Sequence, residues 1–199
     1  MQAALDDPSG WERLDESRGV VVYRKNLADL GLTAFKGEVV LPASADTGRV
    51  FELLCDPPAH MSVSDNLAAS ELLGADGAVL HFYQVLKKSP MIDQRYWMVH
   101  SEIQADIGGT SGHNKRTWDA LSPALYPEAR AAVSQRFDDA AEITENHGSW
   151  ELQPRSDGST LFIYRTVSDP GGAIPESLFR AVSSRTLPSN MLNFVEAAN

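Results

Sequence analysis

Apolar and polar residues alternate along much of the chain, a pattern typical of β-strands with one buried face. From residue 33 to residue 41, apolar or small residues at every second position are separated by Lys36 and Glu38, so one face of this strand is expected to contact water. The Gly74-Ala75-Asp76-Gly77 stretch predicts a hairpin turn between two further strands. Such patterns predict strands over residues 19–25, 33–41, 67–73, 78–86, 95–103, 115–120, 143–152 and 159–167.

Two segments have the spacing of helices instead. A short helix with apolar residues on one side is expected before the Pro57-Pro58 pair, which ends it. Near the C-terminus an apolar stripe recurs every three to four residues from 174 to 198, and Pro175 fits the first helical position. Pro188 lies inside this stripe and is expected to kink or split the helix. Residues 121–141 are rich in Ala and charge and predict no clear element.

The order of these elements predicts the fold class. Strands, one short helix, many antiparallel strands and a long terminal helix indicate one α+β domain, and a chain of 199 residues is the size of a single domain. A curved antiparallel sheet can leave a hollow that an amphipathic helix covers, and small-ligand sites favour such places. Periodicity leaves open whether side chains or a ligand fill that hollow.

Composition excludes several functions. The net charge of −10, from 17 basic and 27 acidic side chains, disfavours binding to nucleic acid and permanent docking on anionic membranes. Cys55 is the only cysteine, which excludes an intrachain disulfide and a zinc site built from several cysteines. The five histidines follow no metal-ligand spacing, so no metal site is expected. No apolar run approaches the roughly 18 residues of a membrane-spanning helix.

Four groups of motifs occur in order between about Trp11 and about Val195. They are Gly10-Trp11-Glu12-Arg13-Leu14 with Gly19-Val20-Val21-Val22-Tyr23; Phe35-Lys36-Gly37-Glu38; Pro90-Met91-Ile92-Asp93-Gln94-Arg95-Tyr96-Trp97; and Trp150-Glu151-Leu152-Gln153-Pro154, Asp169-Pro170-Gly171-Gly172 and Leu187-Pro188. Together they resemble the START (StAR-related lipid transfer) family, most of all its bacterial single-domain members.

This resemblance implies a helix-grip fold over residues 11–195, preceded by an N-terminal extension over residues 1–10. In that fold a curved antiparallel sheet wraps around a long C-terminal helix and encloses an apolar tunnel. The implied function is binding and intermembrane transfer of one apolar lipid, such as a sterol or phospholipid, with transient membrane contact, no cofactor and no catalytic residue. Many of the similar bacterial proteins are exported, so we expect a soluble protein that is periplasmic if an N-terminal signal was trimmed and otherwise cytoplasmic.

Three positions depart from the family pattern. Tyr96 stands where the family usually has Asp after the motif arginine, here Arg95. Sterol-binding relatives carry a second arginine six residues later, which is Ser101 here, and their acidic partner falls at Phe82. The resemblance therefore implies that the charged pair of a sterol site is missing and that this end of the pocket is apolar or weakly polar.

Strand alternation selects candidate ligand contacts, because Arg95, Trp97, Val99, Ser101 and Ile103 share one face of their strand. The alternative is that these residues pack an ordinary core. The predicted ligand-binding residues are Phe82, Trp97, Val99, Ser101, Trp118, Phe162, Leu178, Val182 and Met191. The predicted gate residues are Asp169, Gly171, Gly172 and Ile174, because paired glycines give a loop the freedom to move.

Alternative sites and functions remain open at this point. Four aromatic residues form either a cage for a choline-like head group or ordinary core packing; they are Trp118, Trp150, Phe162 and Tyr164. An enzyme similar to polyketide cyclases and aromatases of the same superfamily needs an acid or base in the pocket, yet His81 and His100 have the opposite parity to the predicted inward residues. A ligand sensor that reports to a partner protein is the third possibility.

Overall fold

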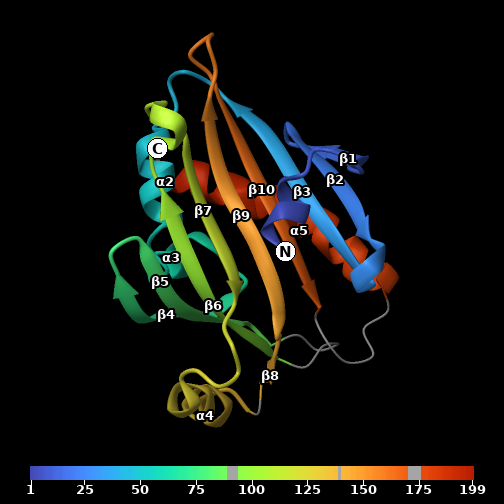
Figure 1. Cartoon of the computed structure of the whole chain (residues 1–199), viewed down its shortest axis with the longest axis vertical. Coiled ribbons are helices and arrows are strands. Elements are labelled where there is room, and N and C mark those ends of the chain that lie inside the picture. The colour runs from blue at the N-terminus through green and yellow to red at the C-terminus, as the bar shows by residue number, and fades with distance from the viewer. Residues whose placement is uncertain (89–93, 139, 170–175) are drawn as a thin grey trace.

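We analysed a computed structural model, which describes residues 1–88, 94–138, 140–169 and 176–199, with backbone alone over 176–185. Within these residues the chain forms a ten-stranded sheet with strand order β1-β2-β3-β10-β9-β7-β6-β5-β4, while β8 pairs with β6 (Figure 1). All strand pairs are antiparallel except β6 with β8. The predicted α+β class is confirmed.

The elements follow the chain in an order close to the predicted one. The strands are β1 (Glu12–Ser17), β2 (Val20–Leu27), β3 (Leu32–Leu41), β4 (Leu67–Asp76), β5 (Val79–Leu86), β6 (Arg95–Gln104), β7 (Asn114–Ala120), β8 (Ala141–Glu142), β9 (Glu145–Pro154) and β10 (Thr160–Asp169). The helices are α1 (Gln2–Asp6), α2 (Thr47–Leu54), α3 (His60–Val63), α4 (Pro127–Arg136) and α5 (Glu176–Ala197), with short 3-10 turns at Ala28–Leu30 and Ile107–Gly109.

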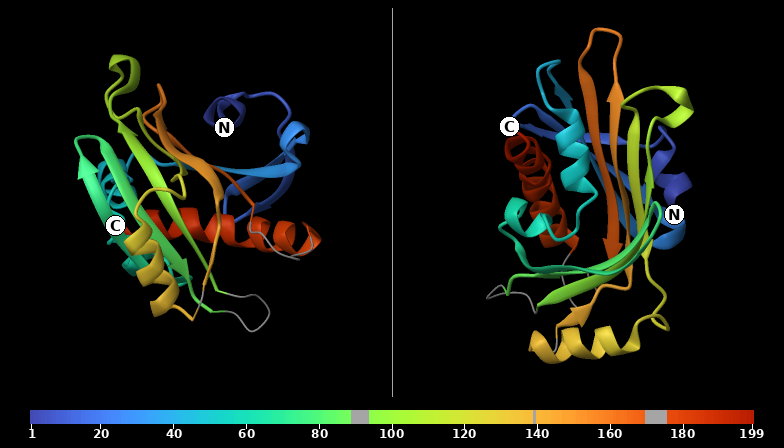
Figure 2. Two further views of the ribbon diagram at one scale, coloured as in Figure 1. Left: turned by 60° about the horizontal axis from the view of Figure 1, so that its bottom comes forward. Right: turned by 90° about the vertical axis from the view of Figure 1, so that its left-hand side faces the viewer.

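The alternation of side chains gives the sheet an inner and an outer face. The inner face packs against α5, α2 and α3, which lie on the same side of the sheet in Figure 2. One row of directly paired residues crosses this face from β2 to β6: Val22, Gly37, Tyr164, Trp150, Arg116 and Ile103. Apart from Arg116 and Gly37 this row is apolar or aromatic, which explains why a helix covers it.

Helix α5 lies close to the sheet at Gly37 of β3. A Cβ atom at this position would overlap the ends of the Leu187 and Met191 side chains, so the missing side chain lets the helix approach the strand. Leu187, Met191 and Phe194 are buried and join the main apolar cluster. The helix runs through Pro188 as a single element, so of the two expected effects, a kink or a split, the split does not occur.

The outer face carries two additional helices. Helix α1 packs near β9 with Leu5 fully buried, so the predicted extension over residues 1–10 contributes to the folded unit. Helix α4 lies within the segment for which the sequence predicted no element, and its Val133 joins a second apolar cluster with Tyr83 and Tyr96. Figure 2 shows α1 on the opposite side of the sheet from α5.

Besides α1, α4 and β8, two further elements were missed by periodicity. Strand β1 is exposed along its whole length, so it has no alternating pattern to detect, and it forms by pairing with β2. Helix α3 has only four residues, too few for a helical period. The α2 helix and the β4–β5 hairpin were predicted correctly, and Asp46 caps α2 by accepting a hydrogen bond from the Arg49 backbone.

Candidate functional site

The inner face brings together the predicted ligand-binding residues that the structure describes. Phe82, Val99, Trp118, Phe162 and Met191 are buried in the main apolar cluster. Trp97 is half-buried and packs at the edge of this cluster, and Ser101 is fully buried on the same face. Contact of these residues with a lipid stays a prediction, and the side chains of Leu178 and Val182 lie outside the described residues.

The predicted gate is described at one residue only. Asp169 is exposed and ends β10 as a strand residue opposite Glu145 of β9. Gly171, Gly172 and Ile174 lie outside the described residues, so the gate stays a prediction.

Of the four aromatic residues weighed as a cage, Trp150, Phe162 and Tyr164 stack, and Trp118 packs beside them at a tilt. The Trp150 and Tyr164 rings are parallel within 10°, with centroids 3.8 Å apart. The Phe162 ring also stacks with Trp150, with centroids 5.5 Å apart. Trp118 lies 6.4 Å from Trp150, and Phe194 of α5 meets Trp150 edge-on at 5.5 Å. Because these rings contact one another through their faces, the faces are not free to receive a cation. The arrangement therefore favours core packing over a cage for a cationic head group.

Arg116 is the unexpected residue of the inner face. It lies on β7 with only 1% of its surface exposed, although arginine is rarely buried without a charged partner. Its Nε donates to Ser101 Oγ at 2.8 Å, and its Nη1 donates to the Leu54 carbonyl at the end of α2. The guanidinium also lies over the Phe82 ring, with its central carbon 4.7 Å from the centroid.

The guanidinium of Arg116 forms no ion pair with a carboxylate among the described residues. Burial in the apolar interior lowers its pKa to about 10, and the Cys55 thiol offsets this effect in part. The side chain nevertheless stays positively charged at neutral pH. A positive charge without a carboxylate partner in a protein interior is costly.

The position of Arg116 corrects one expectation from the sequence. The residues equivalent to the sterol-site pair, Ser101 and Phe82, both contact Arg116, which comes from the neighbouring strand. This end of the inner face is therefore cationic rather than apolar or weakly polar.

A hydrogen-bonded chain of polar side chains lies beside Arg116. Gln84 Nε2 donates to Ser70 Oγ at 2.9 Å and to His60 Nδ1 at 2.8 Å, and Ser70 Oγ donates to the Pro57 carbonyl at 2.5 Å. Because Nδ1 of His60 accepts, its proton resides on Nε2, which donates to the Leu54 carbonyl at 3.2 Å. The 3.4 Å contact of Arg116 Nη1 with that Nε2 therefore joins two donors.

These surroundings keep His60 neutral. Burial and, next, the charge of Arg116 lower the pKa of His60 to about 3, although the backbone of residues 53 and 54 acts in the opposite direction. At neutral pH the site thus combines one fixed cation with neutral hydrogen-bonding groups. Sequence reasoning missed Arg116 and His60, although the alternation in β7 already gives Arg116 the same face as Trp118.

Tyr96, the departure from the family motif, belongs to the outer face. Its ring is buried in the second apolar cluster beneath α4, and its hydroxyl donates to Glu142 of β8 at 3.0 Å. Tyr96 therefore contributes to packing between the sheet and helix α4 and does not line the inner face.

The histidines weighed as catalytic groups lie on the outer face, as their parity predicted. His81 hydrogen-bonds the Tyr126 hydroxyl at 2.8 Å and His100 at 2.9 Å. His147 contacts Asp119 at 2.6 Å and Glu145 at 3.0 Å. Among the described residues no group of three potential ligands is arranged to hold a metal ion.

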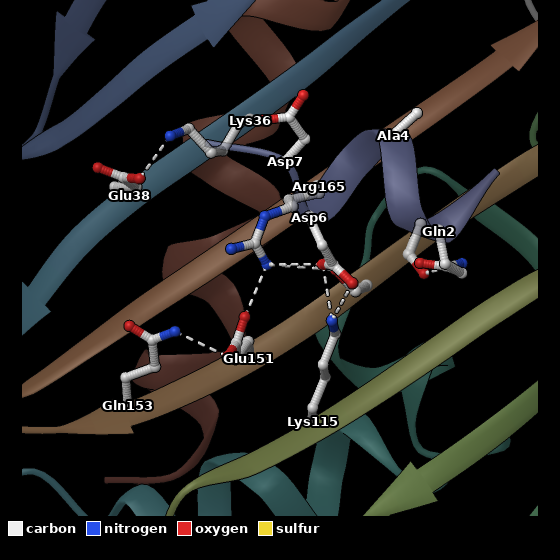
Figure 3. Close-up of polar contacts among 12 residues, drawn as sticks. Gln2, Ala4, Asp6, Asp7, Lys36, Glu38, Lys115, Glu151, Gln153 and Arg165 are labelled. Carbon is white, nitrogen blue, oxygen red and sulfur yellow. Dashed lines mark hydrogen bonds and ion pairs between the residues drawn. The ribbon is translucent and has the colours of Figure 1, made fainter. Parts of the chain in front are cut away.

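A polar network on the outer face attaches the N-terminal helix to the sheet (Figure 3). Arg165 of β10 pairs with Glu151 of β9 at 2.7 Å, and Lys115 of β7 pairs with Asp6 of α1 at 2.7 Å. Burial alone would raise the pKa of Glu151, but hydrogen bonds from His113, Gln153 and Arg165 outweigh it and lower the pKa to about 2. These charges are paired, in contrast to Arg116.

Comparison with solved structures identifies the architecture. The chain aligns over its full length with 90% of human StAR-related lipid transfer protein 5, at a TM-score of 0.79 and 15% sequence identity. It also aligns over 95% of its length with 96% of a STAR-related lipid transfer protein fragment from Xanthomonas axonopodis, at a TM-score of 0.70 and 25% identity. The chain folds as a START-like domain. The predicted helix-grip fold is thereby confirmed.

Other comparisons are less specific. The START-like domain aligns over 84% of its length with 93% of the Zhui aromatase/cyclase from Streptomyces sp. R1128, at a TM-score of 0.57 and 10% identity. In sequence it is 23% identical over 168 residues to an uncharacterized Pseudomonas aeruginosa protein, PA1579, covering 84% of the chain and 76% of that protein. No family model matches the sequence. In the described part of the chain, no helix is long and apolar enough to cross a membrane.

Proposed function

We propose that this START-like domain binds one lipid between the inner face of its sheet and helix α5 and carries it between membranes. The observation that carries the proposal is the combination of this fold with a large cluster of buried apolar and aromatic side chains on the inner face. An apolar surface of this kind can accept the chain of a lipid, since each buried CH₂ group contributes about 0.8 kcal/mol.

Two features support a carrier over an enzyme. The histidines on β5, β6 and β9 face outward, and His60 on the inner side has a pKa too low for proton transfer near neutral pH. Arg116, the charged side chain that lies over Phe82 of the apolar cluster, has a pKa of about 10, which makes it a binding group and a poor acid or base near neutral pH.

The first experiment is native mass spectrometry of the protein purified from its own host, followed by extraction and identification of whatever it releases. The proposal expects one lipid per chain and transfer of that lipid between donor and acceptor vesicles. A protein that binds no lipid and instead converts an added polyketide or ester would replace the carrier with an enzyme. A protein that is empty and inert in both assays would favour a sensor whose ligand is scarce.

A further inference from the structure

Arg116 has more hydrogen-bond donors than the described structure can satisfy. A guanidinium carries five N–H groups. One is donated to Ser101 and one to the Leu54 carbonyl, which leaves three without an acceptor among the described residues. Because only 1% of the surface of Arg116 is exposed, bulk water and salt reach it poorly.

The described groups that contact or lie beside the guanidinium of Arg116 come from α2, α3, β5 and β6 and are neutral. They are the Leu54 carbonyl and Cys55 at the end of α2, His60 of α3, the Phe82 ring of β5 and Ser101 of β6. His60 remains uncharged through its hydrogen bonds to Gln84 and Leu54. The described part of the site therefore has a net positive charge that none of its described residues compensates.

We propose that the lipid carried by this domain has an acidic head group, a carboxylate or a phosphate, that accepts hydrogen bonds from Arg116. This inference rests on the proposed function and names the ligand class for the same site. Two negatively charged oxygens match the planar fork of a guanidinium, whereas a sterol hydroxyl offers one uncharged oxygen. Neutral sterols, carotenoids and hopanoids leave the buried charge unpaired.

A purely structural role for Arg116 makes a different prediction. The hydrogen bond from Arg116 to the Leu54 carbonyl lies at the C-terminal end of α2, where a positive charge is favourable. If this bond were the only role of Arg116, the residue would stabilise the ligand-free protein. A binding arginine destabilises the empty protein, because replacing an unpaired buried charge by an apolar side chain of similar length removes a desolvation cost. The stability of ligand-free Arg116→Met therefore separates the two roles.

The test measures dissociation constants for matched pairs of lipids. Hexadecanoic acid is compared with hexadecan-1-ol, and phosphatidic acid with diacylglycerol of the same chains, in the wild type, Arg116→Met and Arg116→Lys. Arg18→Met, which removes an exposed arginine paired with Glu196, is the control. Inorganic phosphate and acetate are added as competitors, so that a small-anion site is distinguished from a lipid site.

The wild type and the control are expected to bind one acid about ten- to a hundredfold more tightly than its uncharged partner, as charge-assisted hydrogen bonds would give. Which acid is preferred identifies carboxylate or phosphate. Arg116→Met loses this preference, binds the uncharged partner as the wild type does, and unfolds at the same or a higher urea concentration when empty. Arg116→Lys keeps part of the preference, since it retains the charge without the fork.

Three results overturn the inference. Equal binding of acid and uncharged partner by the wild type contradicts the acidic head group but leaves lipid binding intact. Displacement of the acid by millimolar inorganic phosphate or acetate indicates a small-anion site. Loss of stability in empty Arg116→Met, with the acid preference unchanged in Arg116→Lys, assigns Arg116 a structural role. Failure to bind any of the four lipids instead contradicts the proposed function itself.

Discussion

His60 couples the buried polar chain to the stability of the fold. Its ring is buried, accepts from Gln84 and donates to Leu54, and its pKa is lowered to about 3, first by burial and then by the charge of Arg116. In the unfolded chain a histidine titrates near 6.5. Between these two values the unfolded state binds more protons than the folded state, so stability is lost as the pH falls through this window.

This difference predicts a pH dependence that His60→Gln removes. From pH 7 to pH 5 the free energy of unfolding of the wild type is expected to fall more steeply than that of the variant, by up to about 1.4 kcal/mol per pH unit. Urea unfolding at several pH values measures both slopes. The pKa of His81 is also lowered, by burial and then by His100, but it is present in both proteins and cancels. Parallel curves would contradict the assignment of His60.

Among the predicted contact residues whose side chains the structure describes, Trp97 is the most accessible. It is half-buried at the edge of the main cluster and lies opposite Gln84 on the inner face. Trp97→Ala is expected to admit bulkier lipids and to cost up to about 3–5 kcal/mol of stability, the range for closely packed sites. Competition between a slim and a branched lipid measures the change in preference. Leu72→Ala, at an exposed position of β4, is the control, and an unchanged preference in a folded Trp97 variant removes it from the site.

At the scale of elements, the contact between α5 and β3 determines how closely the helix covers the inner face. Gly37 has an ordinary extended backbone, and the nearest atoms that an alanine there would meet belong to side chains, those of Leu187, Met191 and, at 3.4 Å, Val20. At Gly148 of β9 an added Cβ overlaps the Trp118 ring and also the Arg165 carbonyl of the adjacent strand. Side-chain ends can shift, whereas a paired strand backbone cannot shift without breaking its ladder.

Gly37→Ala is therefore expected to lower the free energy of unfolding by about 1–3 kcal/mol, the usual cost of overpacking, and Gly148→Ala by more. Chemical denaturation of both variants gives the comparison. Gly48→Ala in α2 is the matched control, because its Cβ meets only Asp46 at an ordinary 3.5 Å and alanine favours the helix. A Gly37 variant as stable as the control would mean that α5 does not press against β3.

Some elements of the fold could be predicted from the sequence, and others could not. Strands with one buried face, such as β3 and β6, were predicted correctly because alternation is a local consequence of burial. Strand β1 was not, because all its residues are exposed and only pairing with β2 holds it. The α4 helix was missed because only Val133 on it is buried, so the segment lacks an apolar stripe.

For the whole molecule, the net charge of −10 bears on how the proposed carrier meets a membrane. An acidic protein is repelled by anionic lipid surfaces, and salt screens this repulsion over a Debye length of about 10 Å at 0.1 M. Transfer of a labelled lipid to vesicles rich in anionic lipid is therefore expected to accelerate severalfold as salt rises. Stopped-flow fluorescence measures the rate, with zwitterionic vesicles as the salt-independent control. Faster transfer to anionic vesicles at low salt would require a local basic docking surface.

The sequence by itself determined which side chains of each strand share a face, the α+β class and the terminal helix. These follow from spacing along the chain, and they placed Trp97, Val99 and Ser101 together on β6. Only the tertiary structure decided the chemistry of the inner face. Arg116 meets Leu54 across 62 residues of sequence, and Gln84 meets His60 across 24. Such contacts depend on strand order and on how α2 and α3 fold back over the sheet, which no local pattern of apolar residues encodes.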